Sequence, residues 1–278
     1  MDDGKLVPAK EKINTVRQLI LANKDQIQMA LPRAMNPDRF ARIVLTCIST
    51  TPMLLECSPR SLLGAVIQAA QLGLEPGLLG QAYLVPFRDR KRGTVEVQLI
   101  PGYKGLLKLA RNSGEISTIQ AFAVYRDDEF EYGLGTNPHI RHKSTSDETA
   151  QQRPDDIIYV YSFARLKDGG LQFDRPMTRR KIDQHRDQYA KAAKEGPWVT
   201  NYEEMALKTS LRQLCKMLPA ATDHLQVAVS LDERAEAQLP QNLGGLLELP
   251  EPASGTALDI LTTQLEQAGL QGGSLAAP

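Results

Sequence analysis

Residues 98–114 read QLIPGYKGLLKLARNSG, and residues 196–219 read GPWVTNYEEMALKTSLRQLCKMLP. Both segments have apolar residues at helical spacing, and both carry lysine and arginine beside or opposite that apolar stripe. Proline and glycine stand near their ends, as is common at helix boundaries. The two segments therefore predict two helices that pack on a core and present positive charge elsewhere.

In the first segment, a helix is predicted to begin after Pro101 and Gly102 and to end at Gly114. Its cations are four and three residues apart, so they share one narrow face of the helix. They are Lys104, Lys108 and Arg111. The opposite face is apolar and consists of Tyr103, Leu106, Leu107 and Ala110.

In the second segment, Thr200 and Glu203 have the spacing of a capping box, and Pro219 is expected to stop the helix. The apolar stripe is formed by Leu207, Leu211, Leu214 and Leu218. The cations on its flank are Lys208, Arg212 and Lys216. Each basic face could be an ordinary solvated helix surface. Two such faces with few interleaved acids favour an anionic ligand, because an unpaired cationic ridge repels itself.

The charge of the chain is unevenly distributed. The 278 residues include 33 basic and 33 acidic residues, but from Leu231 onward there is one basic residue against seven acidic ones. A basic body with an acidic tail is typical of proteins that bind polyanions. We expect residues 1–10 to be disordered, residues 11–230 to form the working domain, and residues 231–278 to be a largely disordered acidic tail. A short helix is expected at 256–268, because three leucines there have helical spacing.

The cysteine count and the hydropathy place the chain in a reducing compartment. The three cysteines have no CxxC or metal-ligand spacing, so they are interpreted as small core residues. No signal peptide is recognisable, and no apolar run approaches the length of a membrane span. The sequence predicts a soluble, cytoplasmic protein without a membrane association.

The remaining segments predict an α+β fold with a helical N-terminal part and a small antiparallel sheet. Helices are expected over residues 13–31, from Pro37 to before Pro52, and from Pro59 to Gly73, and a further polar helix is capped by Thr178. Strands are expected at 82–87, 95–100, 116–132, 157–166 and 171–173, with a long loop at 135–154. The first two strands flank a basic hairpin tip that contains Arg88, Arg90, Lys91 and Arg92. This tip either guards an exposed edge or joins the flanking helices in a cationic groove.

The sequence has no complete motif for nucleotide hydrolysis or metal chemistry. The string GxxxxGK[ST] is absent, which argues against ATP hydrolysis. Asp155 and Asp156 precede a strand in the manner of a metal-dependent nuclease, but Arg165 stands two residues before Lys167, where such an enzyme needs a carboxylate. The acids at 127–131 are expected to alternate between strand faces. No metal site, cofactor or catalytic centre is therefore expected.

The two basic segments, together with LGLEPG at 72–77 and GQAYLVPF at 80–87, resemble the RecT family of phage-type single-strand annealing recombinases. The resemblance covers roughly residues 25–230. It implies a protein that binds single-stranded DNA without ATP, assembles into oligomers or helical filaments, and anneals complementary strands. It also implies a companion exonuclease and a host single-strand binding protein as partners, and it favours DNA contacts at Lys104, Lys108, Arg111, Lys208, Thr209 and Arg212.

Elementary electrostatics supports the same function, because annealing is opposed by repulsion between two phosphate backbones and a basic groove removes that barrier. Aromatic residues make up only 5% of the chain, so we expect the protein to grip backbones and to leave the bases free. The predicted DNA-binding residues are Arg88, Arg90, Lys91, Arg92, Gln98, Tyr103, Lys104, Lys108, Arg111, Trp198, Lys208, Thr209, Arg212 and Lys216. Trp198 could instead belong to the core. The alternatives for the whole chain are a metal-dependent nuclease and a structural oligomer whose basic faces bind a neighbour's acidic tail.

Overall fold

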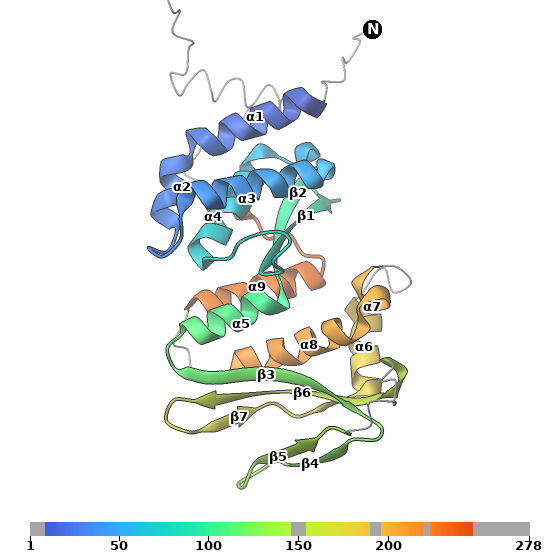
Figure 1. Cartoon of the computed structure of the whole chain (residues 1–278). Coiled ribbons are helices and arrows are strands. Elements are labelled where there is room, and N and C mark those ends of the chain that lie inside the picture. Colours follow the sequence, from blue (N-terminus) through green and yellow to red (C-terminus); the bar gives the residue numbers. More distant parts are fainter. Residues whose placement is uncertain (1–8, 146–153, 190–195, 219–222, 247–278) are drawn as a thin grey trace, which may run out of the picture. The chain divides into compact units, whose positions relative to one another are not determined.

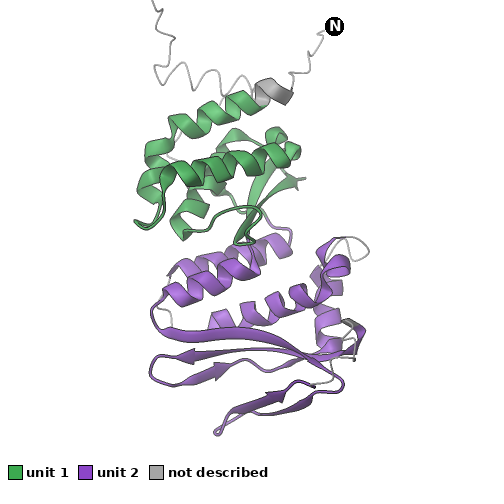
Figure 2. Cartoon of the chain, in the orientation of Figure 1, with its two compact units in different colours: residues 1–100, 240–278 green, residues 101–239 purple. Residues whose placement is uncertain are grey.

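The computed structural model describes residues 9–145, 154–189, 196–218 and 223–246. The chain divides into two compact units (Figure 2). Unit 1 consists of residues 1–100 and 240–278, and unit 2 consists of residues 101–239. Unit 1 is therefore closed by a segment that returns to it from the end of unit 2.

Unit 1 is mostly helical, with one β-hairpin (Figure 1). Its elements are α1 (Ala9–Ala22), α2 (Lys24–Ala30), α3 (Pro37–Thr50), the 3₁₀ turn η1 (Pro52–Glu56), α4 (Pro59–Leu72), β1 (Ala82–Asp89), β2 (Thr94–Pro101) and the 3₁₀ turn η3 (Leu243–Leu246). The centre of the unit is α4, which is buried along almost its whole length. A helix buried on all sides is possible here because α1, α2 and η3 pack around it.

The ends of α3 and α4 follow from local sequence. The side chain of Asn36 accepts a hydrogen bond from the N–H of Arg39 at 2.9 Å, and the side chain of Ser58 does the same for Ser61 at 3.2 Å. Gly73 ends α4 in the left-handed conformation, with φ of 64°. The single helix predicted over residues 13–31 is wrong, because it breaks at Asn23. The Asn23 side chain donates to the carbonyl of Leu19 and so competes with the helical hydrogen bonds.

The outer edge of β2 is covered by polar groups from two other segments. The N–H of Ser58 donates to the carbonyl of Val95 at 2.8 Å, and the hydroxyl of Ser61 accepts from the N–H of Val97 at 3.0 Å. Further along, the Gln241 amide accepts from the N–H of Leu99 and donates to its carbonyl, at 2.8 and 2.9 Å. Such coverage satisfies the groups that an edge strand otherwise leaves open.

Unit 2 is a sheet with helices stacked on one of its faces (Figure 1). Its strands are β3 (Ile116–Tyr125), β4 (Glu129–Gly133), β5 (His139–Lys143), β6 (Ile157–Leu166), β7 (Leu171–Phe173) and β8 (Met177–Thr178). Its helices are α5 (Tyr103–Asn112), the 3₁₀ turn η2 (Pro154–Asp156), α6 (Arg179–Tyr189), α7 (Pro197–Thr200), α8 (Tyr202–Met217) and α9 (Asp223–Glu236). The main sheet has the order β3-β6-β7, with β8 also paired to β6, and β4 and β5 form a separate hairpin.

The helix α8 lies on this sheet and carries α5 and α9 on its other side. Contact with the sheet includes a buried hydrogen bond from the Ser162 hydroxyl to the carbonyl of Ser210, at 3.0 Å. The inward side chains of β3 and β6 are small or apolar, which allows α8 to approach closely. This packing sets the positions of the basic residues on α5 and α8.

The α+β class, the helical N-terminal part and the small antiparallel sheets are confirmed. Several details differ from the sequence predictions. The expected loop over 135–154 contains β5, and the expected strand over 116–132 is two strands separated by a turn. The capping box at Thr200 is not formed, because Thr200 ends α7 and the Glu203 carboxylate instead accepts a hydrogen bond from the Tyr125 hydroxyl at 2.7 Å.

The predicted domain boundary at residue 231 is also corrected by the structure. Residue 231 lies inside α9, and η3 packs on α4 so closely that a Cβ at Gly64 would overlap the carbonyl of Leu243. The Arg60 guanidinium donates to the carbonyl of Gly244 at 2.8 Å. The folded part thus extends at least to Leu246, and the helix predicted at 256–268 lies outside the described residues. At the other end, α1 begins at Ala9, inside the segment expected to be disordered.

None of the helices described for this chain combines the length and the apolar character that crossing a membrane requires.

Candidate nucleic-acid interface

The tip of the β1–β2 hairpin presents cations on a rigid turn. Asp89 is buried and its carboxylate accepts hydrogen bonds from the N–H groups of Lys91 and Arg92, at 2.9 and 3.3 Å. The Arg92 guanidinium lies within 4 Å of two carboxylates, those of Asp89 and Glu96. Arg92 is therefore partly neutralised, whereas its neighbours in the turn are not.

Three cations of the tip are exposed to solvent. They are Arg88, Arg90 and Lys91. Within the described part of the chain, no carboxylate lies at ion-pair distance from any of them. Exposed cations without a carboxylate partner carry their full charge toward solvent and are available to an anionic ligand.

The helix α5 in unit 2 presents a second, smaller set of cations. Lys104 and Arg111 are exposed, and no ion pair to either is present among the residues with a described position. Lys108 and Tyr103 are half-buried. Burial raises the pKa of Tyr103, with the backbone of Ala121 and the charge of Arg111 acting in the opposite direction. Tyr103 is thus a neutral, partly packed ring beside the cationic face.

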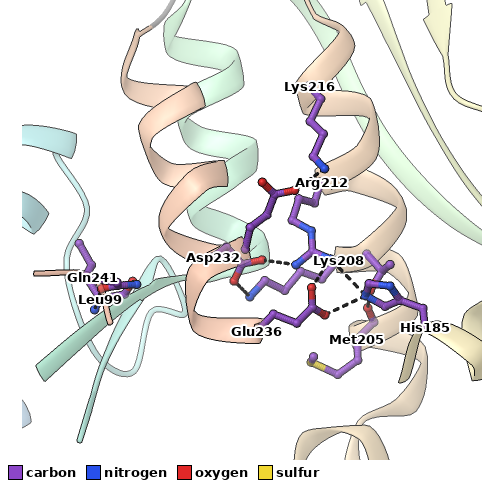
Figure 3. Close-up of polar contacts among 11 residues, drawn as sticks. Leu99, His185, Met205, Lys208, Arg212, Lys216, Asp232, Glu236 and Gln241 are labelled. Atoms are coloured by element: carbon purple, nitrogen blue, oxygen red, sulfur yellow. Dashed lines mark hydrogen bonds and ion pairs between the residues drawn. The ribbon is translucent and has the colours of Figure 1, made fainter. Parts of the chain in front are cut away.

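The cations of α8 differ from those of the hairpin tip, because each of them has a carboxylate partner on α9 (Figure 3). The Lys208 ammonium lies 2.5 Å from Asp232, and the Arg212 guanidinium lies 3.0 Å from Asp232 and 2.5 Å from Glu236. Lys216 pairs with Glu233. The basic ridge that the sequence presents as unpaired is therefore an intramolecular ion-pair network.

The centre of this network is removed from water. Arg212 is only 4% exposed and Asp232 only 3%. His185 of α6 completes it, with Nε2 at 2.8 Å from the Glu236 carboxylate and 3.2 Å from the Arg212 guanidinium. Burial alone would raise the pKa of Glu236, but His185 and Arg212 hold that pKa below its ordinary value. The network fastens α6, α8 and α9 to one another.

Sequence reasoning missed Asp232, Glu236 and His185 as members of this site. The overall composition after residue 231 is typical of a disordered tail, so it does not reveal the two acids as part of a folded helix. The sequence does contain one indication of this pairing. The acids at 232, 233 and 236 have helical spacing, and Lys208, Arg212 and Lys216 on the preceding helix also repeat every four residues.

Three further residues predicted to contact DNA lie inside the protein. Trp198 is 8% exposed and belongs to a core cluster with Ile157, Val160 and Tyr202, in agreement with the alternative considered for it. Thr209 is buried and its hydroxyl donates to the carbonyl of Met205 on its own helix. Gln98 is also buried. As placed here, these side chains do not reach a solvent-exposed ligand.

The hairpin tip belongs to unit 1 and α5 to unit 2, so each presents a cationic surface of its own unit. A single groove that joins them stays a prediction.

A second group of polar side chains lies in unit 2. The Asp128 carboxylate is 3.0 Å from one ring nitrogen of His142, and the Tyr161 hydroxyl is 3.1 Å from the other. Within the described part of the chain, no three carboxylate, histidine or cysteine side chains gather in a way that could hold a metal ion.

The Asp128 carboxylate is held by several hydrogen bonds within the protein. Its side chain is buried, and it also accepts hydrogen bonds from the N–H groups of Tyr125 and Thr145, at 2.8 and 2.9 Å. Burial alone would raise the pKa of Asp128, but these bonds and His142 lower it. Burial, with the charge of Asp128, raises the pKa of Tyr161 to about 12. The acidic cluster at 127–131 thus contains a structural aspartate that locks the β4–β5 hairpin in place.

Comparison with known proteins places this architecture in a family. The RecT family matches residues 38–242, which include the hairpin, α5, α8 and α9. The chain is 43% identical over 236 residues to protein RecT of Escherichia coli (strain K12), and the alignment covers 83% of this chain and 85% of that protein. It is also 23% identical over 202 residues to the uncharacterized protein YqaK of Bacillus subtilis (strain 168), over 72% of this chain and 66% of that protein. The chain belongs to the RecT family, and is thereby a DNA-binding protein of recombination by single-strand annealing.

Proposed function

We propose that this chain binds single-stranded DNA through its exposed cations and anneals complementary strands without nucleotide hydrolysis. The observation that carries the proposal is the hairpin tip, where Arg88, Arg90 and Lys91 are exposed on a turn fixed by Asp89. Such a turn holds these three cations at a defined place, and none of them lies at ion-pair distance from a carboxylate of the described residues. Lys104 and Arg111 on α5 would supply further phosphate contacts.

The mechanism requires only electrostatics and base pairing. Two strands repel each other through their phosphates, and cations that neutralise these phosphates release counterions and lower the barrier to their approach. Contacts to phosphate carry no sequence information, so one protein can serve any pair of complementary strands. Stacking and pairing of the bases then supply the free energy of annealing, and no ATP is needed.

Four of the predicted DNA contacts have carboxylate partners in the protein itself, namely Arg92, Lys208, Arg212 and Lys216. Arg92 lies near Asp89 and Glu96, and Lys216 pairs with Glu233. Both side chains are solvent-accessible, so a phosphate could exchange with the carboxylate at little cost. Arg212 is different, because a phosphate would have to enter a buried site. We therefore assign Arg212 to the folding of unit 2 rather than to DNA.

We further propose that the chain acts as a homo-oligomer. A strand long enough to find its complement exceeds the reach of one hairpin tip and one helix, and adjacent copies along the strand would keep it extended and neutralised. The single strands would be supplied by a nuclease that removes one strand of a duplex, and a host single-strand binding protein would compete for the same substrate. These partners follow from the chemistry of the substrate and from the family.

The proposal is tested with two complementary oligonucleotides that carry a fluorophore and a quencher. We expect the purified full chain to accelerate quenching in buffer with EDTA and without nucleotide, and to leave both strands at full length when magnesium is added. Acceleration that requires ATP would contradict the proposal. Magnesium-dependent shortening of the strands that Asp155→Ala abolishes would favour the nuclease alternative instead.

A further inference from the structure

The sheet of unit 2 has a second face that the helices do not cover. Along β6, successive side chains alternate between the two faces, so those at every second position point away from α8. These are Tyr159, Tyr161, Phe163 and Arg165. On the neighbouring strand β3, Phe122 lies opposite Tyr161 and Gln120 lies opposite Phe163. This face, which we call the aromatic face, therefore carries rings at regular cross-strand spacing.

Aromatic residues are scarce in this chain but concentrated on this face. The whole sequence has 15 phenylalanine, tyrosine and tryptophan residues. Six of them make ring contacts with one another at the aromatic face: Phe122, Phe130, Tyr132, Tyr159, Tyr161 and Phe163. The low average content of aromatic residues conceals this local concentration.

The β4–β5 hairpin covers only one end of the aromatic face (Figure 1). Phe130 of this hairpin lies with its ring centroid 5.4 Å from those of Tyr159 and Tyr161. The bonds of His142 to Asp128 and Tyr161 hold the hairpin there. Tyr161 is consequently buried, and the covered end is part of the core of unit 2.

The other end of the aromatic face is less buried by the described residues. Phe122 is 39% exposed, which is unusual for a phenylalanine at the centre of a strand. The ring of Phe163 lies beside it, with the centroids 6.3 Å apart and the ring planes within 13° of each other. Gln120 and Arg165 are exposed next to these rings, and no carboxylate is present on the outward positions of β3 and β6 described here. An exposed ring and a half-buried ring that lie nearly parallel, beside an arginine and an amide, are elements from which surfaces that stack nucleobases are built.

We propose that Phe122 and Phe163 form a stacking platform for unpaired bases of single-stranded DNA, with Arg165 binding a phosphate of the same strand. This inference rests on the proposed function and adds a contact to bases to the phosphate contacts described above. An exposed ring, a half-buried ring and a cation, with no carboxylate on the outward positions of β3 and β6, fit a polyanion that carries flat apolar groups. An apolar protein partner would offer Gln120 and Arg165 no polar or anionic group to bind.

Stacking on this platform is compatible with annealing. A base that lies flat on a ring is held through its π-face, and its Watson–Crick edge remains at the periphery. Every base has such a face, so the contact tolerates any sequence. The scarcity of aromatic residues predicts that the protein leaves the bases free. At this one surface the proposal adds a contact to the bases.

The experiment compares two ligands of equal length and charge, oligo(dT) and an oligomer of abasic deoxyribose phosphate. We expect the wild-type full chain to bind oligo(dT) more tightly, by roughly tenfold for stacking of one to two bases. The double variant Phe122→Leu/Phe163→Leu keeps apolar side chains of similar size but has no rings. It is expected to bind the two ligands equally, with its affinity for the abasic oligomer unchanged. Tyr83→Leu, which removes an exposed ring in unit 1, serves as the matched control and should keep the preference of the wild type.

Other results would overturn the inference. Equal binding of both ligands by the wild-type chain would show that bases contribute nothing, and a preference that survives in the double variant would place the base contact elsewhere. A double variant that changes the assembly size but not the ligand preference would assign the aromatic face to a second copy of the chain. Failure of the wild type to bind either ligand would instead refute the proposed function. Circular dichroism of each variant verifies that it is folded.

Discussion

Replacement of Arg212 by alanine is expected to lower the free energy of unfolding by about 3 kcal/mol, because it removes the buried cation that joins Asp232 to Glu236 and leaves only Lys208 and His185 beside these carboxylates. His185 cannot compensate fully, since it contacts only one of the two acids in the described structure. Chemical denaturation followed by circular dichroism measures the effect. If Arg212→Ala is as stable as the wild type and has lost its affinity for single-stranded DNA, Arg212 contacts DNA directly and its assignment to the fold is wrong.

Lys216→Ala is the matched control for this change. Its ion pair joins the same two helices, but the Lys216 and Glu233 side chains are 38% and 43% exposed. Solvent screens such a pair, so the expected loss is below about 1 kcal/mol. The contrast between two cations one helical turn apart isolates the contribution of burial from that of charge.

Two truncations are expected to differ strongly in their effect. Removal of residues 231–278 takes away Asp232, Glu236 and the segment that carries Gln241 and Leu243. It should unfold unit 2 in part and expose the edge of β2 in unit 1. Removal of residues 247–278 should leave the melting temperature nearly unchanged. Thermal melts of the two shortened chains at equal concentration provide the comparison.

The shorter truncation also tests the role of the acidic tail. Residues 247–278 contain four acidic residues and no lysine or arginine. Their removal should leave the affinity for single-stranded DNA unchanged at high salt and tighten it at low salt, where long-range repulsion is less screened. If the truncation at 247 weakens DNA binding at both salt concentrations, the tail takes part in the interface or in assembly. If the chain that lacks residues 231–278 is as stable as the wild type, residues 231–246 are not part of the folded protein and the boundary given by the structure is wrong.

Those parts of the fold that depend on neighbouring residues could be predicted from the sequence. The starts of α3 and α4 follow from Asn36-Pro37 and Ser58-Pro59, since each cap is formed within four residues. The strand expected over 157–166 has the observed bounds of β6, because its apolar pattern is continuous and ends at a glycine turn. Local propensity and tertiary packing agree in these segments.

The errors arise where residues distant in sequence decide the structure. Asp232 is acidic and lies in a polar region, so composition assigns it to a tail, yet it is buried against Arg212, twenty residues earlier. The hairpin strand β5 is polar, and its sequence alone predicts a loop. Its stability comes from pairing with β4 and from the bonds of His142. A helical cation next to an apolar stripe can point toward solvent or toward an acid on another helix, and the spacing alone does not distinguish the two.

The prediction of the candidate site also succeeded where local structure decides exposure and failed where tertiary packing does. The cations of the hairpin tip are exposed as predicted, because a tight turn at the end of two strands is surrounded by solvent. The resemblance to the family favours DNA contacts at Thr209 and Arg212, and Trp198 stands beside a basic helix in the sequence, but the structure places all three inside the protein. An exposed ring such as Phe122 could not be predicted, because alternation along β3 identifies two faces but not which of them a helix covers.

The most direct test of the central claim, that exposed cations hold the DNA backbone, is the salt dependence of binding to single-stranded DNA. The variant Arg88→Ala/Arg90→Ala/Lys91→Ala should flatten the slope of log K against log salt by about 2, since each lost phosphate contact removes about 0.7. At 0.1 M salt its affinity should fall on the order of 100-fold, equally for homopolymeric and mixed sequences. The control Arg175→Ala/Arg180→Ala/Lys181→Ala removes three exposed cations of unit 2 and should keep the wild-type slope. An unchanged slope and affinity in the hairpin variant would contradict the account.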